Sequence, residues 1–141
     1  MKAVLEAFNA HDLDRIMSFF ADDCVLEMPR GPDPWGTRYT GLAAVREGLR
    51  SRLVGIPDVQ YTDDTHFVAD DIGVSQWMLR GTTANGENVE VRGCDFFTFA
   101  DDGKFSRRTH TGKSETAHEV AGWNESGTLV KFTQASADLF A

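Results

Sequence analysis

Hydrophobic residues recur with a helical period through the first part of the chain. Residues 2–9 predict a helix with one apolar face. Asp12 can cap a second helix, whose apolar positions follow the i, i+3, i+4, i+7 pattern: Leu13, Ile16, Met17 and Phe20. A third helix is predicted over residues 42–53, and Gly55 and Pro57 end it.

The pattern then changes to the alternation of β-strands. We predict a short strand over residues 24–28, and longer strands over residues 59–68, 73–82, 88–99 and 104–111. Residues 29–41 are dense in proline and glycine, which favours a loop or an edge strand. Helices followed by consecutive strands indicate an α+β domain, a curved antiparallel sheet wrapped around helices. The concave face of such a sheet forms a pocket for a small molecule.

Composition narrows the classes of partner. The 141 residues fit one domain, and the net charge of −8 argues against binding nucleic acid or an anionic membrane. Arg46, Arg50 and Arg52 are spaced as a solvated helix face. Cys24 and Cys94 lie in apolar contexts typical of a reducing compartment, and the start of the chain has no signal-peptide pattern. We therefore expect a cytoplasmic protein.

Metal and cofactor motifs are absent from the sequence. The four histidines are scattered without paired spacing, and no glycine-rich phosphate loop occurs. The sequence therefore predicts neither a metal nor another cofactor.

A carboxylate interrupts the aromatic strand VEVRGCDFFTF, residues 89–99. If Asp95 faces an apolar pocket, its pKa rises, and the neutral acid can donate a hydrogen bond to a carbonyl or phenolate oxygen. In the alternative interpretation Asp95 is structural and pairs with Arg92, Arg80 or His66. Alternation places Phe97 and Phe99 on the same face as Asp95.

Three stretches resemble one family. NAHDLDRIMSFFADDCVLEMP (residues 9–29), WGTRYTGLAAVREGL (35–49) and VEVRGCDFFTFADDGK (89–104) are similar to the SnoaL-like branch of the nuclear transport factor 2-like superfamily. The resemblance implies a cone-shaped, cystatin-like fold with a central pocket, and members are commonly homodimers. It covers about the first three quarters of the chain, and residues 1–112 are taken as the domain.

The superfamily includes ketosteroid isomerases, which the chain matches at one of three catalytic positions. Met28, before Pro29, stands where those enzymes have a catalytic Asp, and Val4 stands where they have a Tyr. Asp95 matches the protonated Asp that donates to an oxyanion. The resemblance therefore supports an oxyanion donor and leaves ketosteroid isomerisation without its base.

Other residues extend the candidate site. His66 is a possible general base, although a lone strand histidine is more often only hydrogen-bonded. Arg92 with Asp95 loosely resembles the Arg and Asp of limonene-epoxide-hydrolase-like members, but alternation puts the two side chains on opposite faces unless Gly93 forms a bulge. The expected pocket residues are Met28, Trp35, Tyr39, Trp77, Met78, Phe97, Phe99 and Arg92. Between Ser75 and Arg80, either Trp77 and Leu79 or Gln76, Met78 and Arg80 point inward.

The end of the chain departs from the family pattern. Where the family continues with a sequence such as RKDSYWKI, this chain reads RRTHTGKS, residues 107–114. One run of bases, AAG GAC TCA TAC TGG AAA ATC G, encodes Lys-Asp-Ser-Tyr-Trp-Lys-Ile in one frame and Arg-Thr-His-Thr-Gly-Lys-Ser in the next. We therefore hypothesise a frameshift near residues 101–107 and an atypical tail over residues 113–141, so that His110 and His118 carry no family role. The nucleotide sequence tests this hypothesis.

Two functions remain open from the sequence. The first is a proton-transfer enzyme of the isomerase, cyclase or dehydratase kind, acting on a small hydrophobic carbonyl or phenolic compound, with Asp95 and His66 as catalytic residues. The second is a non-catalytic ligand-binding or dimerisation domain on the same fold. An epoxide-hydrolase-like activity is a lesser alternative.

Overall fold

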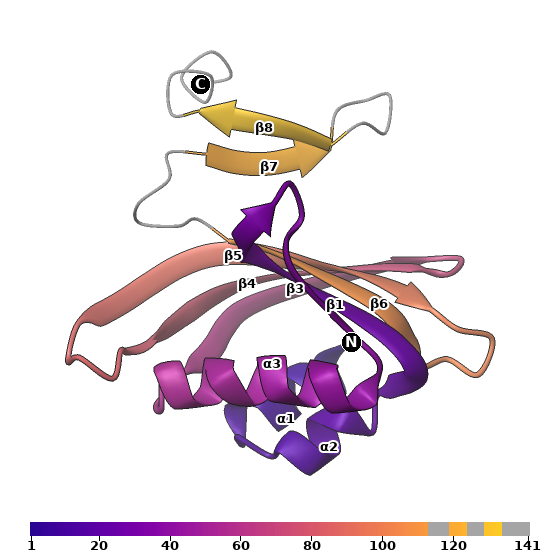
Figure 1. The fold of residues 1–141 in the computed structure, drawn as a ribbon, viewed down its shortest axis with the longest axis horizontal. Helices are drawn as coiled ribbons and strands as arrows, with labels where there is room; N and C mark the ends of the chain where they lie inside the picture. The colour runs from indigo at the N-terminus through magenta and orange to yellow at the C-terminus, as the bar shows by residue number, and fades with distance from the viewer. Residues whose placement is uncertain (113–118, 124–128, 134–141) are drawn as a thin grey trace.

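The computed structural model describes residues 1–112, 119–123 and 129–133, and in them three helices pack inside a curved six-stranded sheet (Figure 1). The helices are α1 (Lys2–Asn9), α2 (Leu13–Met17) and α3 (Leu42–Gly55). The strands are β1 (Phe20–Asp33), β2 (Gly36–Thr40), β3 (Gln60–Ala69), β4 (Ile72–Thr82), β5 (Asn88–Phe99) and β6 (Phe105–Gly112). The α+β prediction is confirmed.

The strand order is β2-β1-β6-β5-β4-β3. Neighbouring strands are antiparallel except β1 and β6, which run parallel and join the two halves of the sheet. The proline- and glycine-rich segment, for which the sequence favoured a loop or an edge strand, lies at the edge of the sheet. β1 continues through Pro29 to Asp33, and β2 pairs back onto it as the outermost strand.

The second helix is shorter than its apolar pattern. The Asp12 carboxylate accepts a hydrogen bond from the Arg15 amide at 2.9 Å, which is the predicted N-cap. The helix ends at Met17, because Phe20 already begins β1 and pairs with Phe105 of β6. Phe20 therefore packs in the same core as Leu13, but it does not belong to the second helix.

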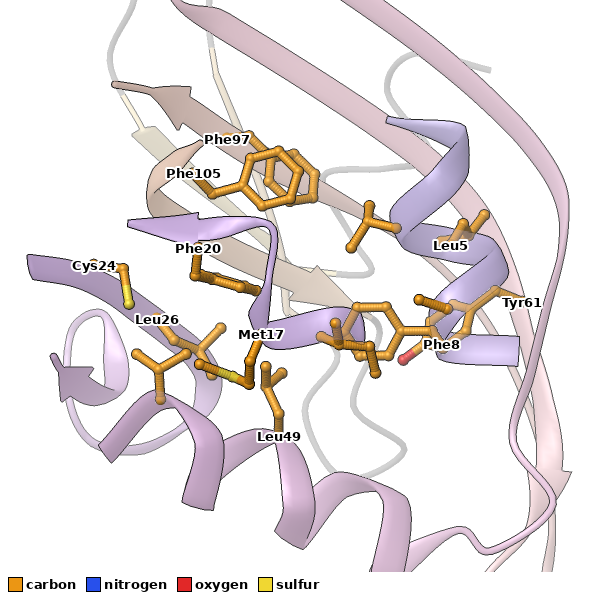
Figure 2. Packing of buried hydrophobic residues seen from close by; sticks show 14 of the residues in the cluster. Leu5, Phe8, Met17, Phe20, Cys24, Leu26, Leu49, Tyr61, Phe97 and Phe105 are labelled. Carbon is orange, nitrogen blue, oxygen red and sulfur yellow. The ribbon is translucent and has the colours of Figure 1, made fainter. Parts of the chain in front are cut away.

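The core fills the space between the helices and the concave face of the sheet (Figure 2). The Phe97 and Phe105 rings lie 4.4 Å apart between centroids, and Phe8 meets Tyr61 edge-on at 5.6 Å. Gly48 permits the close approach of α3, because a Cβ there would lie 2.9 Å from the Tyr39 ring. Aromatic packing therefore fixes the distance between helices and sheet.

The predicted tail, residues 113–141, lies largely outside the described residues. Within it the structure describes β7 (Glu119–Trp123) and β8 (Leu129–Thr133), which pair as a separate two-stranded antiparallel sheet. No helix among the described residues is long and apolar enough to cross a membrane.

Candidate functional site

A row of polar side chains crosses the middle of the concave face. Asp95 of β5 is paired in register with Ser75 of β4 on one side and with His110 of β6 on the other, and Ser75 is paired with His66 of β3. Side chains of directly opposed residues point to the same face of a sheet. Four strands thus place polar groups side by side on the face that packs against the apolar core.

Asp95 is the centre of this row and is 1% exposed. Its Oδ2 accepts hydrogen bonds from Trp77 Nε1 at 3.0 Å and from the Arg108 guanidinium at 2.9 Å. Its Oδ1 lies 2.8 Å from His110 Nδ1. The Arg108 guanidinium is itself buried and lies 4.7 Å above the Phe8 ring. Three donors, one of them a buried cation, therefore surround the carboxylate.

This environment keeps Asp95 ionised, which corrects the expectation of a neutral hydrogen-bond donor. Burial alone would raise its pKa, but the Arg108 charge and the hydrogen bonds from His110 and Arg108 outweigh burial and hold the pKa of Asp95 well below its usual range. Its structural partners are also different from the predicted Arg92, Arg80 or His66. An ionised carboxylate accepts hydrogen bonds and cannot donate one.

His110 contacts Asp95 and also lines a cavity. Burial lowers the pKa of His110 to about 4, and the Arg52 and Arg108 charges add to this effect while Asp95 opposes it. The ring is therefore neutral near pH 7. Its Nδ1 must hold the proton, because Asp95 can only accept, and its Nε2 accepts from Arg52 NH2 at 3.0 Å. The two contacts fix the tautomer, and both His110 and Arg52 line a cavity.

The cavity has a volume of about 410 Å³ and lies between the end of α3, the end of β1 and the strands β4 and β5. Its wall combines His110 and Arg52 with the Trp77 ring and apolar side chains such as Leu79, Val91 and Ile56. The other polar lining residues are Arg30, Ser51, Thr83 and Glu87. The size and the few convergent polar groups are typical of a small-molecule site.

Two of the predicted pocket residues line this cavity, Met28 and Trp77. Trp77 and Leu79 point inward, which settles the phase of β4. Met78 and Arg92 are paired on the opposite, convex face beside a smaller cavity of about 210 Å³. Because β4 and β5 pair without interruption through Gly93, Arg92 and Asp95 point to opposite faces.

The remaining predicted residues lie elsewhere. Phe97 and Phe99 pack on Phe105 in the core. Tyr39 lies against α3, and Trp35 is exposed with the Arg38 guanidinium 4.5 Å above its ring. His66 shares the concave face but is separated from Asp95 by Ser75, and its Nε2 lies 2.9 Å from Asp64 Oδ2. Among the described residues, no three His, Cys, Asp or Glu side chains are placed to hold a metal ion.

Sequence reasoning missed Arg52, Arg108 and His110. The prediction of one solvated face for the arginines of α3 holds for Arg46 and Arg50, which form exposed ion pairs with Asp14 and Glu47. It is wrong for Arg52, which turns to His110. Alternation in the last strand gave a signal for Arg108 and His110, since the two share a face.

A second buried carboxylate lies on the convex face. Glu27 of β1 is 6% exposed and contacts Arg38 of β2 at 2.6 Å and Arg107 of β6 at 3.0 Å. Its Oε2 accepts from the Thr109 hydroxyl at 2.8 Å. This cluster ties β2, β1 and β6 together.

A curved sheet that encloses helices and a cavity is the fold of the nuclear transport factor 2-like class. Solved structures agree. A candidate polyketide cyclase from Xanthomonas campestris pv. campestris matches with a TM-score of 0.67 and 26% identity over 77% of this chain and 84% of that chain. A nuclear transport factor 2-like protein of unknown function from Burkholderia pseudomallei matches with a TM-score of 0.71 and 20% identity over 79% and 86%. A candidate isomerase from Bacillus subtilis matches with a TM-score of 0.68 and 16% identity over 79% and 82%.

The family follows from the sequence match. A model of the SnoaL-like domain matches residues 1–108. The chain belongs to the SnoaL-like family, as its motifs predicted. The match ends at Arg108, two residues before His110.

Proposed function

We propose that this chain binds a small hydrophobic molecule with a carbonyl or phenolic oxygen in the concave-face cavity and transfers a proton on it. The observation that carries the proposal is the orientation of His110. Its Nδ1–H is held by a buried, ionised carboxylate, and the ring lines the cavity, where Arg52 donates to its Nε2. A base oriented by a second group is the usual arrangement for general base catalysis.

Each polar residue has a role in this proposal. His110 Nε2 takes a proton from the carbon next to the carbonyl, the electron pair of that C–H bond forms a carbon–carbon double bond, and the π pair of the C=O bond moves to the oxygen. Arg52 stabilises the resulting enolate. Asp95 is a positioning residue that fixes the tautomer and stabilises the imidazolium. When the substrate is a β,γ-unsaturated ketone, the enolate is conjugated with the C=C bond, and return of the proton to the γ carbon completes an isomerisation.

The structural neighbours share the fold, and their names do not establish the reaction of this chain. One is a candidate polyketide cyclase and another a candidate isomerase, at 26% and 16% identity. An epoxide-hydrolase-like activity lacks its pair, because Arg92 and Asp95 are on opposite faces of the sheet. We keep the predictions of a homodimer and of a cytoplasmic location as part of this proposal, and light scattering of the purified chain checks the first.

The test measures proton abstraction without the natural substrate. In D2O, the exchange of the acidic α-hydrogens of an aromatic ketone such as 2-tetralone is followed by NMR. We expect the protein to accelerate this exchange, and His110→Asn to reduce the acceleration by about 100-fold, within the range of general base effects. His66→Asn is the matched control and tests the other predicted base. Exchange that depends on His66 and not on His110 would contradict the assignment.

A non-catalytic ligand-binding domain is the second candidate. The observation that favours it is the 3.0 Å contact between Arg52 and His110, which occupies the lone pair that a base needs. Binding of the ketone without any accelerated exchange would support this function instead.

A further inference from the structure

Arg52 is a cation without an acidic partner in the part of the chain that the structure describes. The arginines that form ion pairs there are Arg15, Arg38, Arg46, Arg50, Arg80, Arg107 and Arg108. The guanidinium of Arg52 instead donates to the neutral His110 ring. A neutral acceptor is a weaker partner for a guanidinium than a carboxylate, which can accept two parallel hydrogen bonds.

The position of Arg52 directs this cation into the cavity. It lies in the last turn of α3, where a positive charge is favoured by the helix carbonyls, and it is half-buried at the cavity wall. Glu87 also lines the cavity but is exposed and lies on the turn between β4 and β5. The one acidic group next to His110, Asp95, is already shared by three donors. The polar end of the cavity is therefore cationic in a chain of net charge −8.

The contact of Arg52 also conflicts with the role of His110 as a base. While Arg52 donates to Nε2, no substrate proton can reach that atom. The charged groups that face His110 are Asp95 from β5, Arg108 from β6 and Arg52 from α3. Of these, Asp95 and Arg108 are almost completely buried and bonded to each other, whereas Arg52 is partly exposed. Arg52 is the group that a ligand can move.

Resting on the proposed function, we infer that the cavity is built for an acidic ligand, a carboxylate or an ionised phenol or enol, whose oxyanion takes the Arg52 guanidinium from His110. Binding of the anion thereby uncovers Nε2. It also neutralises one of the two cations that disfavour protonation of the ring, so His110 binds a proton more readily in the complex. A neutral ligand of the same shape moves Arg52 less readily, because a neutral oxygen is a weaker acceptor for a guanidinium than an oxyanion, and it leaves the charge around His110 unchanged.

The experiment compares 2-naphthoate with 2-naphthamide, which share a ring system and differ in charge. Binding to the full chain is measured by calorimetry at pH 6 in two buffers of different ionisation enthalpy, which also counts the protons taken up. We expect naphthoate to bind at least about tenfold more tightly than naphthamide, since hydrogen bonds to charged groups are the stronger kind. We expect net proton uptake with naphthoate only.

Three variants assign the effect. Arg52→Gln should remove the preference for naphthoate over naphthamide, while Arg52→Lys should retain part of it. His110→Asn should abolish proton uptake. Arg50→Gln, on the exposed side of the same helix, is the matched control and should keep both.

The outcomes separate this inference from the proposed function. Equal binding of the two ligands, or a preference that survives Arg52→Gln or depends on Arg30, overturns the inference. Ketone exchange that persists in that case leaves the proposed function intact. A preference for the anion without any ketone exchange supports the inference and rejects the catalytic function. Binding of neither ligand overturns both the inference and the ligand-binding cavity.

Discussion

The sheet buries one carboxylate on each face, and β6 supplies partners to both. Arg107 and Thr109 contact Glu27 on the convex face, whereas Arg108 and His110 contact Asp95 on the concave face. The side chains of Arg38 and Arg107 around Glu27 are 40% and 47% exposed, but that of Arg108 beside Asp95 is 3% exposed. Similar ion pairs thus have different surroundings.

The difference separates a structural cluster from a candidate site. The partners of Glu27 reach solvent and can be hydrated if the carboxylate is lost, so the cluster is a clamp between strands. The partners of Asp95 are enclosed, and one of them, His110, presents its second nitrogen to a cavity. Because the Asp95 cluster is buried, removing one of its partners costs more free energy than in the Glu27 cluster. The cavity next to His110 makes the Asp95 cluster the candidate functional site.

The largest expected effect comes from removing each carboxylate in turn. Asp95→Ala leaves the Arg108 charge buried without a partner and should lower the free energy of unfolding by about 3–5 kcal/mol. Glu27→Ala is the matched control and should cost about 1–2 kcal/mol, because Arg38 and Arg107 can be hydrated. Urea unfolding of both variants measures the two losses. Equal losses would mean that the difference in burial does not matter.

The pH dependence of stability should also come from the concave cluster. The folded-state pKa of His110 is about 4, below its ordinary value of 6.5, so the unfolded chain binds more protons between these values. Stability is therefore complete above about pH 6.5 and falls as the pH drops toward 4, by about 3 kcal/mol at 1.36 kcal/mol per pKa unit. Protonation of Asp95 adds a further loss in stronger acid, since its pKa is lowered too.

His110→Asn isolates this contribution, because the Asn amide can still donate to Asp95. Urea unfolding at several pH values between 4 and 7 should show a shallower slope for the variant than for the parent chain. An unchanged slope would show that His110 is protonated in the folded state, and the assigned tautomer would then be wrong.

Much of the fold followed from the sequence, because apolar periodicity and the family motifs are local signals. Such local signals predicted the helix cap at Asp12 and the edge segment. They also predicted that Asp95 and Phe97 point to the same, inward face. The partners of Asp95 did not follow, since they depend on the register of two strands. The pairing of β5 with β6 shifts by one residue between Thr98 and Phe99, so that Arg108 and His110 point inward in place of Arg107 and Thr109.

The position of Arg52 shows a second limit. Helical spacing groups it with Arg46 and Arg50, which lie on the exposed side of α3, but the end of the helix passes the cavity. Arginines at helical spacing therefore have different environments when only one of them, here Arg52, lies next to a cavity. The frameshift hypothesis covers Arg108 and His110 as well as the tail, and the codons of residues 101–114 test it.

A smaller effect is expected from weakening the convex cluster. Glu27→Gln keeps the shape and some hydrogen bonds, and should lower stability by about 1 kcal/mol without changing ketone exchange or naphthoate binding. Because Arg38 and Arg107 are partly exposed, the loss should shrink when about 1 M salt is added. Asp95→Asn, measured beside it, should keep its larger loss in salt. Equal salt sensitivity would remove the distinction between an exposed and an enclosed cluster.

The smallest expected effect comes from Ser75, next to Asp95 in the polar row. Its side chain is 2% exposed, and its hydroxyl has no hydrogen-bond partner in the described part of the chain. A buried hydroxyl without a partner opposes folding, so Ser75→Ala should stabilise the protein by about 0.5–1 kcal/mol in urea unfolding. Thr109→Val, which removes a hydroxyl bonded to Glu27, should instead destabilise it by a similar amount. If Ser75→Ala is destabilising, the hydroxyl is bonded to a buried water, and the polar row continues from Asp95 toward His66.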